Sequence, residues 1–92
     1  MALLSDAEIE EKLAALPGWE RQGEAIEKSF KREDFVGSVR FVASLVEPAE
    51  EMNHHPDLAI SWDTVTVTIS THSEGGLTAN DFELAGKIDS LA

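Results

Sequence analysis

The chain has 92 residues, enough for one domain with a single core, and 42% of them are hydrophobic. Eighteen acidic residues against seven basic ones give a formal net charge of −11, which disfavours direct binding to nucleic acid and to anionic membranes. The absence of cysteine excludes disulfides, thiolate nucleophiles and cysteine-ligated metal clusters. No signal peptide pattern and no long apolar segment is evident, so we expect a cytoplasmic protein.

The first element is a predicted helix over residues 5–16. Ser5 stands three residues before Glu8, which is the spacing of a capping box, and apolar residues then recur at helical intervals. Pro17 and Gly18 end this pattern. The next segment, 19–31, predicts a β-hairpin whose two strands flank a turn at Gly23-Glu24.

A long helix is predicted over residues 33–52. Five apolar residues, spaced four, three, four and three apart, share one helical face and are expected to form its core side: Phe35, Val39, Val42, Val46 and Ala49. Pro48 removes a backbone donor and clashes with the carbonyl of Ser44, so the last part of this helix should be kinked or separate.

The second half of the chain predicts another hairpin and a closing helix. Residues 58–62 alternate in polarity, a turn is expected at Asp63-Thr64, and alternation resumes over 65–69. Thr78 and Asp81 then form a second capping box, which opens a helix reaching Leu91.

These elements predict one α+β domain over residues 1–92. The order is helix, two strands, helix, two strands, helix, and none of the connections requires parallel strands. The simplest layered arrangement is a four-stranded antiparallel sheet with three helices packed on one face.

Two adjacent histidines in the stretch MNHHPD, His54 and His55, follow the predicted long helix, and His72 follows the last strand. In an antiparallel hairpin with its turn at 63–64, the residue numbers of two paired positions add up to about 127. This places His72 level with about residue 55. Imidazoles accept or donate protons near neutral pH, so this cluster suits a reaction that moves two protons, such as a dehydration. Nearby carboxylates can orient or tune the rings; the candidates are Glu50, Glu51, Asp57 and Asp81.

The same residues resemble the signature of the pterin-4a-carbinolamine dehydratases. That signature has an acidic residue, a His-His-Pro block, an aromatic residue, a histidine and an aspartate at fixed intervals. It matches Glu50, His54-His55-Pro56, Trp62, His72 and Asp81 without a departure. The segments THSEGGLTANDFELA and WERQGEAIEKSFKREDFVGSVRFV also resemble the family, so the likeness covers nearly the whole chain.

The resemblance implies removal of water from the 4a-hydroxytetrahydropterin left by aromatic amino acid hydroxylases, without a metal or organic cofactor. It implies that His54, His72 and Asp81 form the catalytic group, with the two histidines sharing the acid and base roles. His55 and Glu50 are expected to bind the substrate. The family also implies a homodimer or a homotetramer, which suits a chain with a small core.

Other interpretations remain open. The capping box alone accounts for Asp81, and Trp62 and Trp19 are expected in the core or at a subunit contact. A metal-binding protein could use His54, His55, His72 and Asp57, although adjacent histidines point in different directions. A third possibility is a binding or assembly partner, since some members of the resembled family have such roles.

Overall fold

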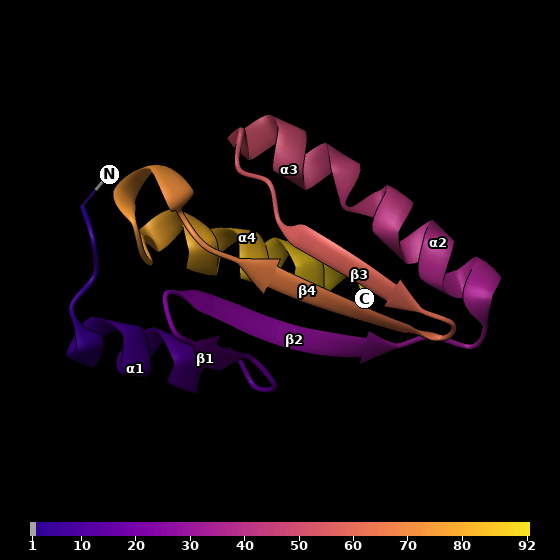
Figure 1. The fold of residues 1–92 in the computed structure, drawn as a ribbon, viewed down its shortest axis with the longest axis horizontal. Helices are drawn as coiled ribbons and strands as arrows, with labels where there is room; N and C mark the ends of the chain where they lie inside the picture. Colours follow the sequence, from indigo (N-terminus) through magenta and orange to yellow (C-terminus); the bar gives the residue numbers. More distant parts are fainter. Residues whose placement is uncertain (1) are drawn as a thin grey trace.

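Four antiparallel strands form one sheet in the order β1-β2-β4-β3, in a computed structural model that describes residues 2–92 (Figure 1). The strands are β1 (Glu20–Gln22), β2 (Ala25–Lys31), β3 (Asp57–Ser61) and β4 (Thr64–Ile69). The helices are α1 (Asp6–Ala14), α2 (Phe35–Ser44), α3 (Val46–Met52), the short 3-10 helix η1 (His72–Glu74) and α4 (Ala79–Leu91). This confirms the predicted α+β class and the antiparallel sheet.

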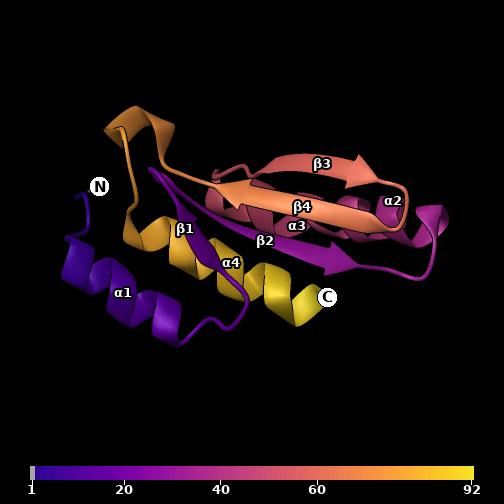
Figure 2. The ribbon, with the colours of Figure 1, turned by 60° about the horizontal axis from the view of Figure 1, so that its bottom comes forward.

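The helices lie on one side of the sheet (Figure 2). Strand β4 shows this most clearly, because Val65, Val67 and Ile69 are fully buried while the threonines between them are only half-buried. This alternation is the period-2 pattern of a strand with one face on the core.

Among residues 2–92, no helix is long and apolar enough to cross a membrane.

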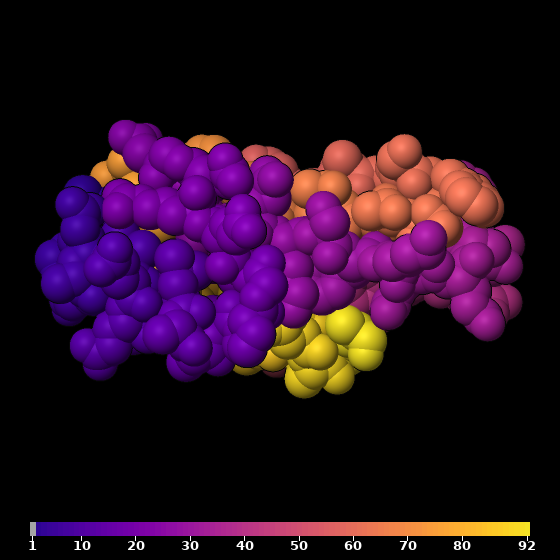
Figure 3. Space-filling view, turned by 90° about the horizontal axis from the view of Figure 1, so that it is seen from below, coloured from indigo at the N-terminus to yellow at the C-terminus, as the bar shows by residue number. Residues whose placement is uncertain are grey.

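The predicted start of the first helix is confirmed. The backbone N–H of Ser5 donates to the Glu8 carboxylate at 2.9 Å, and the Glu8 N–H donates to the Ser5 hydroxyl at 3.2 Å. The bond from the Ser5 backbone N–H, followed by the nearby Ser5 hydroxyl, lowers the pKa of Glu8 below its usual value of 4.5. Seen from below, the N-terminal half of the chain covers much of the surface, with the end of α4 emerging beside it (Figure 3).

The long helix predicted over 33–52 is two helices in sequence. The break falls at Leu45, and Pro48 lies in the first turn of α3, where a missing N–H leaves no helical bond unmade. A continuous helix would require Pro48 to bond the carbonyl of Ser44, and the proline cannot do so. The separation was predicted, but it comes three residues before the proline.

The predicted core face of this segment is wrong. Phe35, Val39 and Val46 are 45–60% exposed, and only Ala49 of the predicted stripe is buried. Helix α2 buries Ser38 and Phe41 instead, and the Phe41 ring lies 5.0 Å from that of Phe30 in β2. The segment 33–52 is apolar on more than one side. Its periodicity therefore identifies an apolar helical face but does not show whether that face packs against the sheet.

The second hairpin has a different register from the predicted one. Ser61 pairs with Thr64 and Asp57 with Thr68, so paired positions sum to 125 and the turn is at Trp62-Asp63. Trp62 has a left-handed backbone at φ 50°, which is rare for a bulky residue. Its carbonyl accepts a 2.7 Å bond from the buried Ser38 hydroxyl, which holds the turn.

The two tryptophans differ in environment. Trp19 is in the core as predicted, only 4% exposed, and its indole N–H donates to Asp89. The Trp62 side chain is 68% exposed, which excludes the predicted place in the core of this chain.

Candidate active site

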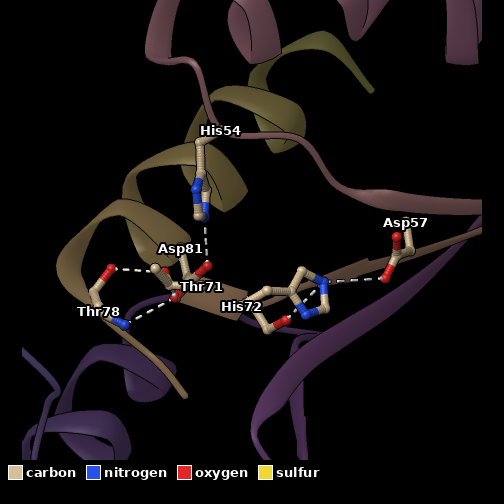
Figure 4. A network of polar contacts seen from close by, with 7 residues as sticks. His54, Asp57, Thr71, His72, Thr78 and Asp81 are labelled. Carbon is tan, nitrogen blue, oxygen red and sulfur yellow. Dashed lines mark hydrogen bonds and ion pairs between the residues drawn. The ribbon is translucent and has the colours of Figure 1, made fainter. Parts of the chain in front are cut away.

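The His54 side chain is positioned by the end of α3. Asn53 caps this helix in the left-handed conformation, at φ 48° and ψ 45°, which asparagine adopts more readily than most residues. The His54 N–H then donates to the carbonyl of Ala49 at 3.0 Å. This reversal of the chain directs the His54 ring toward the start of α4 (Figure 4).

His54 meets Asp81 in the first turn of α4. The Nε2 atom lies 2.6 Å from Oδ1 of Asp81, which is fully buried, while the imidazole is only 11% exposed. The other carboxylate oxygen, Oδ2, accepts 2.8 Å bonds from the Thr78 N–H and the Thr71 hydroxyl. The predicted capping box is therefore present, and its aspartate also contacts a candidate catalytic histidine.

Thr71 is the residue that sequence reasoning missed. It follows β4, is 7% exposed, and bonds to Thr78 through the two hydroxyls at 2.9 Å as well as to Asp81. A threonine one position before a candidate histidine carries no distinctive signal, because threonines alternate along the whole preceding strand.

His55 lies in a more exposed place and pairs with Glu50. Its Nε2 is 2.5 Å from Oε2 of Glu50, and the two side chains are 55% and 67% exposed. Pro56 follows His55 and biases that residue toward an extended backbone. These two residues, both predicted to bind the substrate, are thus in contact with each other.

His72 begins η1 and lies beside the first residue of β3. Its Nε2 is 3.8 Å from Oδ2 of Asp57 and 3.4 Å from the Ser70 hydroxyl, and the ring is 77% exposed. Figure 4 shows this ring extending toward Asp57. The observed register would place His72 level with residue 53, but β4 ends at Ile69 and the His72 ring lies beside Asp57, so the predicted pairing with residue 55 is absent.

Each histidine therefore has a carboxylate near its Nε2 atom, within hydrogen-bond distance for His54 and His55 and at 3.8 Å for His72. A carboxylate held against one ring nitrogen fixes the ring orientation and favours the protonated nitrogen there. The other nitrogen, Nδ1, is then the one available for exchange with a ligand. Such an arrangement suits proton transfer to or from a small polar molecule.

An apolar groove of about 180 Å³ borders the His55–Glu50 pair. Its walls come from α2, α3 and the start of β3: Val42, Leu45, Val46, Ala49, Pro56 and Leu58. His54 and His72 do not line this groove. Among residues 2–92, no three His, Asp or Glu side chains are grouped so that they could hold a metal ion.

Comparisons with known proteins agree on one family. The family model described as pterin 4 alpha carbinolamine dehydratase matches residues 2–91. A protein of Thermosynechococcus vestitus named "putative pterin-4-alpha-carbinolamine dehydratase" is 53% identical, covering 97% of this chain and 94% of its own length. A similarly named protein of Roseiflexus castenholzii is 50% identical over 98% of this chain and 97% of its own.

Two solved structures are also similar. A transcriptional coactivator/pterin dehydratase from Brucella melitensis superposes with a TM-score of 0.94 at 39% identity, covering 99% of both chains. A pterin dehydratase-like protein described as a RuBisCO assembly factor superposes with a TM-score of 0.68 at 23% identity, covering 82% of this chain and 89% of its own. The second likeness concerns the fold alone.

Proposed function

The chain belongs to the pterin 4 alpha carbinolamine dehydratase family, and we propose that it removes water from a 4a-hydroxytetrahydropterin to give a quinonoid dihydropterin. The observation that carries this proposal is that each signature histidine has a carboxylate oxygen within 3.8 Å of its Nε2 atom, with the buried His54–Asp81 contact at 2.6 Å. An aromatic amino acid hydroxylase is the class of enzyme that would supply the substrate.

The reaction needs two proton transfers and no net change in protons. The C4a–O bond breaks as the hydroxyl takes a proton from an acid and leaves as water. The N5–H proton passes to a base, and its electron pair forms the N5=C4a double bond. We assign the two transfers to His54 and His72, without fixing which ring donates.

The remaining signature residues act around this pair. Asp81 orients the His54 ring through the 2.6 Å contact and is thus a positioning residue in this proposal. His55 and Glu50 border the apolar groove, and we assign them to binding of the pterin or its side chain.

A dehydration assay tests the proposal. A hydroxylase generates the 4a-carbinolamine, and dihydropterin formation is followed in the ultraviolet with and without the protein. His54→Ala should lower kcat by about 10²–10⁴-fold, the usual contribution of acid–base catalysis. His55→Ala is the matched histidine control and should raise KM with a smaller change in kcat. Equal kcat values for wild type and His54→Ala would refute the assignment.

We also propose that the chain self-associates through the exposed apolar side of α2 and the edge strand β3. Phe35, Val39, Val46 and Trp62 are each 45–68% exposed, an unusual concentration for one side of a 92-residue protein. Within residues 2–92, β3 is a terminal strand of the sheet, so its outer backbone groups can pair with a second copy.

Light scattering after gel filtration tests the association. Val39→Lys should reduce the molar mass toward 10.0 kDa, because a charge in an apolar contact is costly to bury. Glu11→Gln, on the exposed side of α1, makes the same change in net charge and should leave the mass unchanged. A monomeric wild type would refute this part of the proposal.

A binding or assembly role is the alternative function, and the Brucella melitensis relative at 39% identity supports it, because that protein is described as a transcriptional coactivator as well as a pterin dehydratase. A binding role would survive loss of the histidines, whereas dehydration would not. Pull-down and dehydration measurements on the same His54→Ala sample separate the two. The alternative would be favoured if His54→Ala still captured a defined partner and the wild-type protein showed no dehydration.

A further inference from the structure

The hydroxyl of Thr71 lies behind the His54–Asp81 pair and has no part in the assignments above. The backbone of Thr71 is already fixed by other groups: its N–H donates to the Gly76 carbonyl at 3.0 Å, and its own carbonyl accepts from the N–H groups of Glu74 and Gly75. The loop therefore does not need the hydroxyl to hold its shape. A buried hydroxyl in such a place is free to serve another group.

The hydrogens in this network can be assigned by counting donors. The Thr78 N–H can only donate, and it donates to Oδ2 of Asp81 at 2.8 Å. The Thr71 hydroxyl donates its single hydrogen to the same oxygen, so the 2.9 Å bond between the two threonines takes its hydrogen from Thr78. Oδ2 thus receives two hydrogens and carries none of its own.

This donor set determines the proton on His54. Two donors already occupy Oδ2, so Oδ1 is the carboxylate oxygen left to accept, and Nε2 of His54 carries a hydrogen toward it. Among residues 2–92, Nδ1 makes no hydrogen bond, and no buried polar side-chain atom lacks a partner. Nδ1 therefore lies at the accessible part of an otherwise covered ring.

From these contacts we propose that Thr71 is a positioning residue for His54. Its hydroxyl fixes the Asp81 carboxylate, which holds His54 in the Nε2–H tautomer and leaves Nδ1 as the nitrogen that exchanges a proton with the pterin. The tautomer assignment stands on the geometry alone, whereas the identity of the exchanging ligand rests on the proposed dehydratase function.

Two substitutions separate the hydroxyl from the rest of the side chain. Thr71→Val keeps the branched shape and removes the hydroxyl, and Thr71→Ser keeps the hydroxyl and removes a methyl group. Thr71→Val should lower kcat by about 10- to 100-fold, the usual effect of losing a group that orients a site residue, with KM within about twofold. Thr71→Ser should retain at least half of the wild-type kcat.

Ring ¹⁵N chemical shifts of His54 in labelled protein provide a readout that packing alone would not move. Wild type and Thr71→Ser should show the Nε2–H tautomer, and Thr71→Val should show a mixture with Nδ1–H. A wild-type Nδ1–H tautomer overturns the proposal, as does Thr71→Val with wild-type shifts and kcat. If Thr71→Val does not fold, the wild-type tautomer decides.

The two proposals fail in distinguishable ways. A protein without dehydration activity that still shows the Nε2–H tautomer, dependent on the Thr71 hydroxyl, refutes the function and supports the positioning role. An active protein whose tautomer and kcat ignore the hydroxyl supports the function and refutes the positioning role.

Discussion

Replacing Asp81 by asparagine should separate the structural role of this side chain from its role toward His54. The amide oxygen can take the place of Oδ2 and accept from Thr71 and Thr78, while the amide NH₂ faces Nε2 of His54. The ring must then accept at Nε2 and carry its hydrogen on Nδ1. All three hydrogen bonds persist, but the tautomer is reversed.

The expected free energies follow from this count. A hydrogen bond to a charged group contributes about 1.5–3 kcal/mol and a neutral one about 0.5–1.5 kcal/mol. Weakening three bonds therefore costs about 3 kcal/mol. An amide costs less to bury than a carboxylate, and this difference offsets part of the loss. We expect Asp81→Asn to lower the free energy of unfolding by about 1–3 kcal/mol. Asp81→Ala leaves three buried partners without an acceptor and should cost about 3–6 kcal/mol, a large part of the stability of a small domain.

The activity should change far more than the stability. With the hydrogen on Nδ1, His54 presents the wrong nitrogen to the substrate, and kcat should fall by about 10²–10⁴-fold. Urea denaturation gives the first quantity and the dehydration assay gives the second, on the same sample. An Asp81→Asn variant that is folded and retains wild-type kcat would refute the reasoning.

Three further predictions concern the fold. In the Val39→Lys background, which is expected to be monomeric, Trp62→Gly should keep or raise the free energy of unfolding by up to about 1 kcal/mol. Glycine adopts the left-handed backbone at this turn without strain, and the indole is mostly exposed in the single chain. Urea denaturation would show a clear loss if the turn depended on the indole. Phe41→Ala should lower the same free energy by about 3–5 kcal/mol, measured in the same way, and a change below 1 kcal/mol would contradict the corrected core face. Because the pKa of Glu8 is lowered in the folded chain, the Glu8 carboxylate stabilises the fold at pH values above 4.5, the usual pKa of this group. That contribution is lost as the pH falls through the lowered pKa. Wild type should therefore be more stable than Glu8→Gln near pH 7, with the two converging in acid-dependent unfolding measurements; a constant difference down to pH 2 would argue against the Ser5 bonds as the cause.

The sequence predicted those parts of the fold whose signals are local. Helix α1 begins at its capping box, and β4 alternates as a strand with one buried face should. The sheet follows from such elements, because short connections between strands favour antiparallel neighbours. Local pattern and global fold agree at these positions.

The remaining features depend on contacts between distant residues. The left-handed backbone at Trp62, held by Ser38 of α2, shifted the hairpin register by two residues, and no local rule places a tryptophan there. The faces of α2 could not be ranked from periodicity, because Phe41 and Phe35 are equally apolar and only their neighbours distinguish them.

The candidate site shows the same division. The signature identified the histidines, but their pairing with carboxylates depends on how α3 ends at Asn53 and where α4 begins. His54 and Asp81 are 27 positions apart in the sequence and meet only in the folded chain.

The carboxylate that opens α4 is also the one that holds the His54 ring, so a single side chain links helix initiation to the proposed chemistry. Redesign of this helix start for greater thermal resistance would disturb the imidazole, even with substitutions that are harmless in an ordinary cap. Conversely, thermal fraying of one helical turn would release the ring before the rest of the chain unfolds. Heat inactivation should then precede global melting.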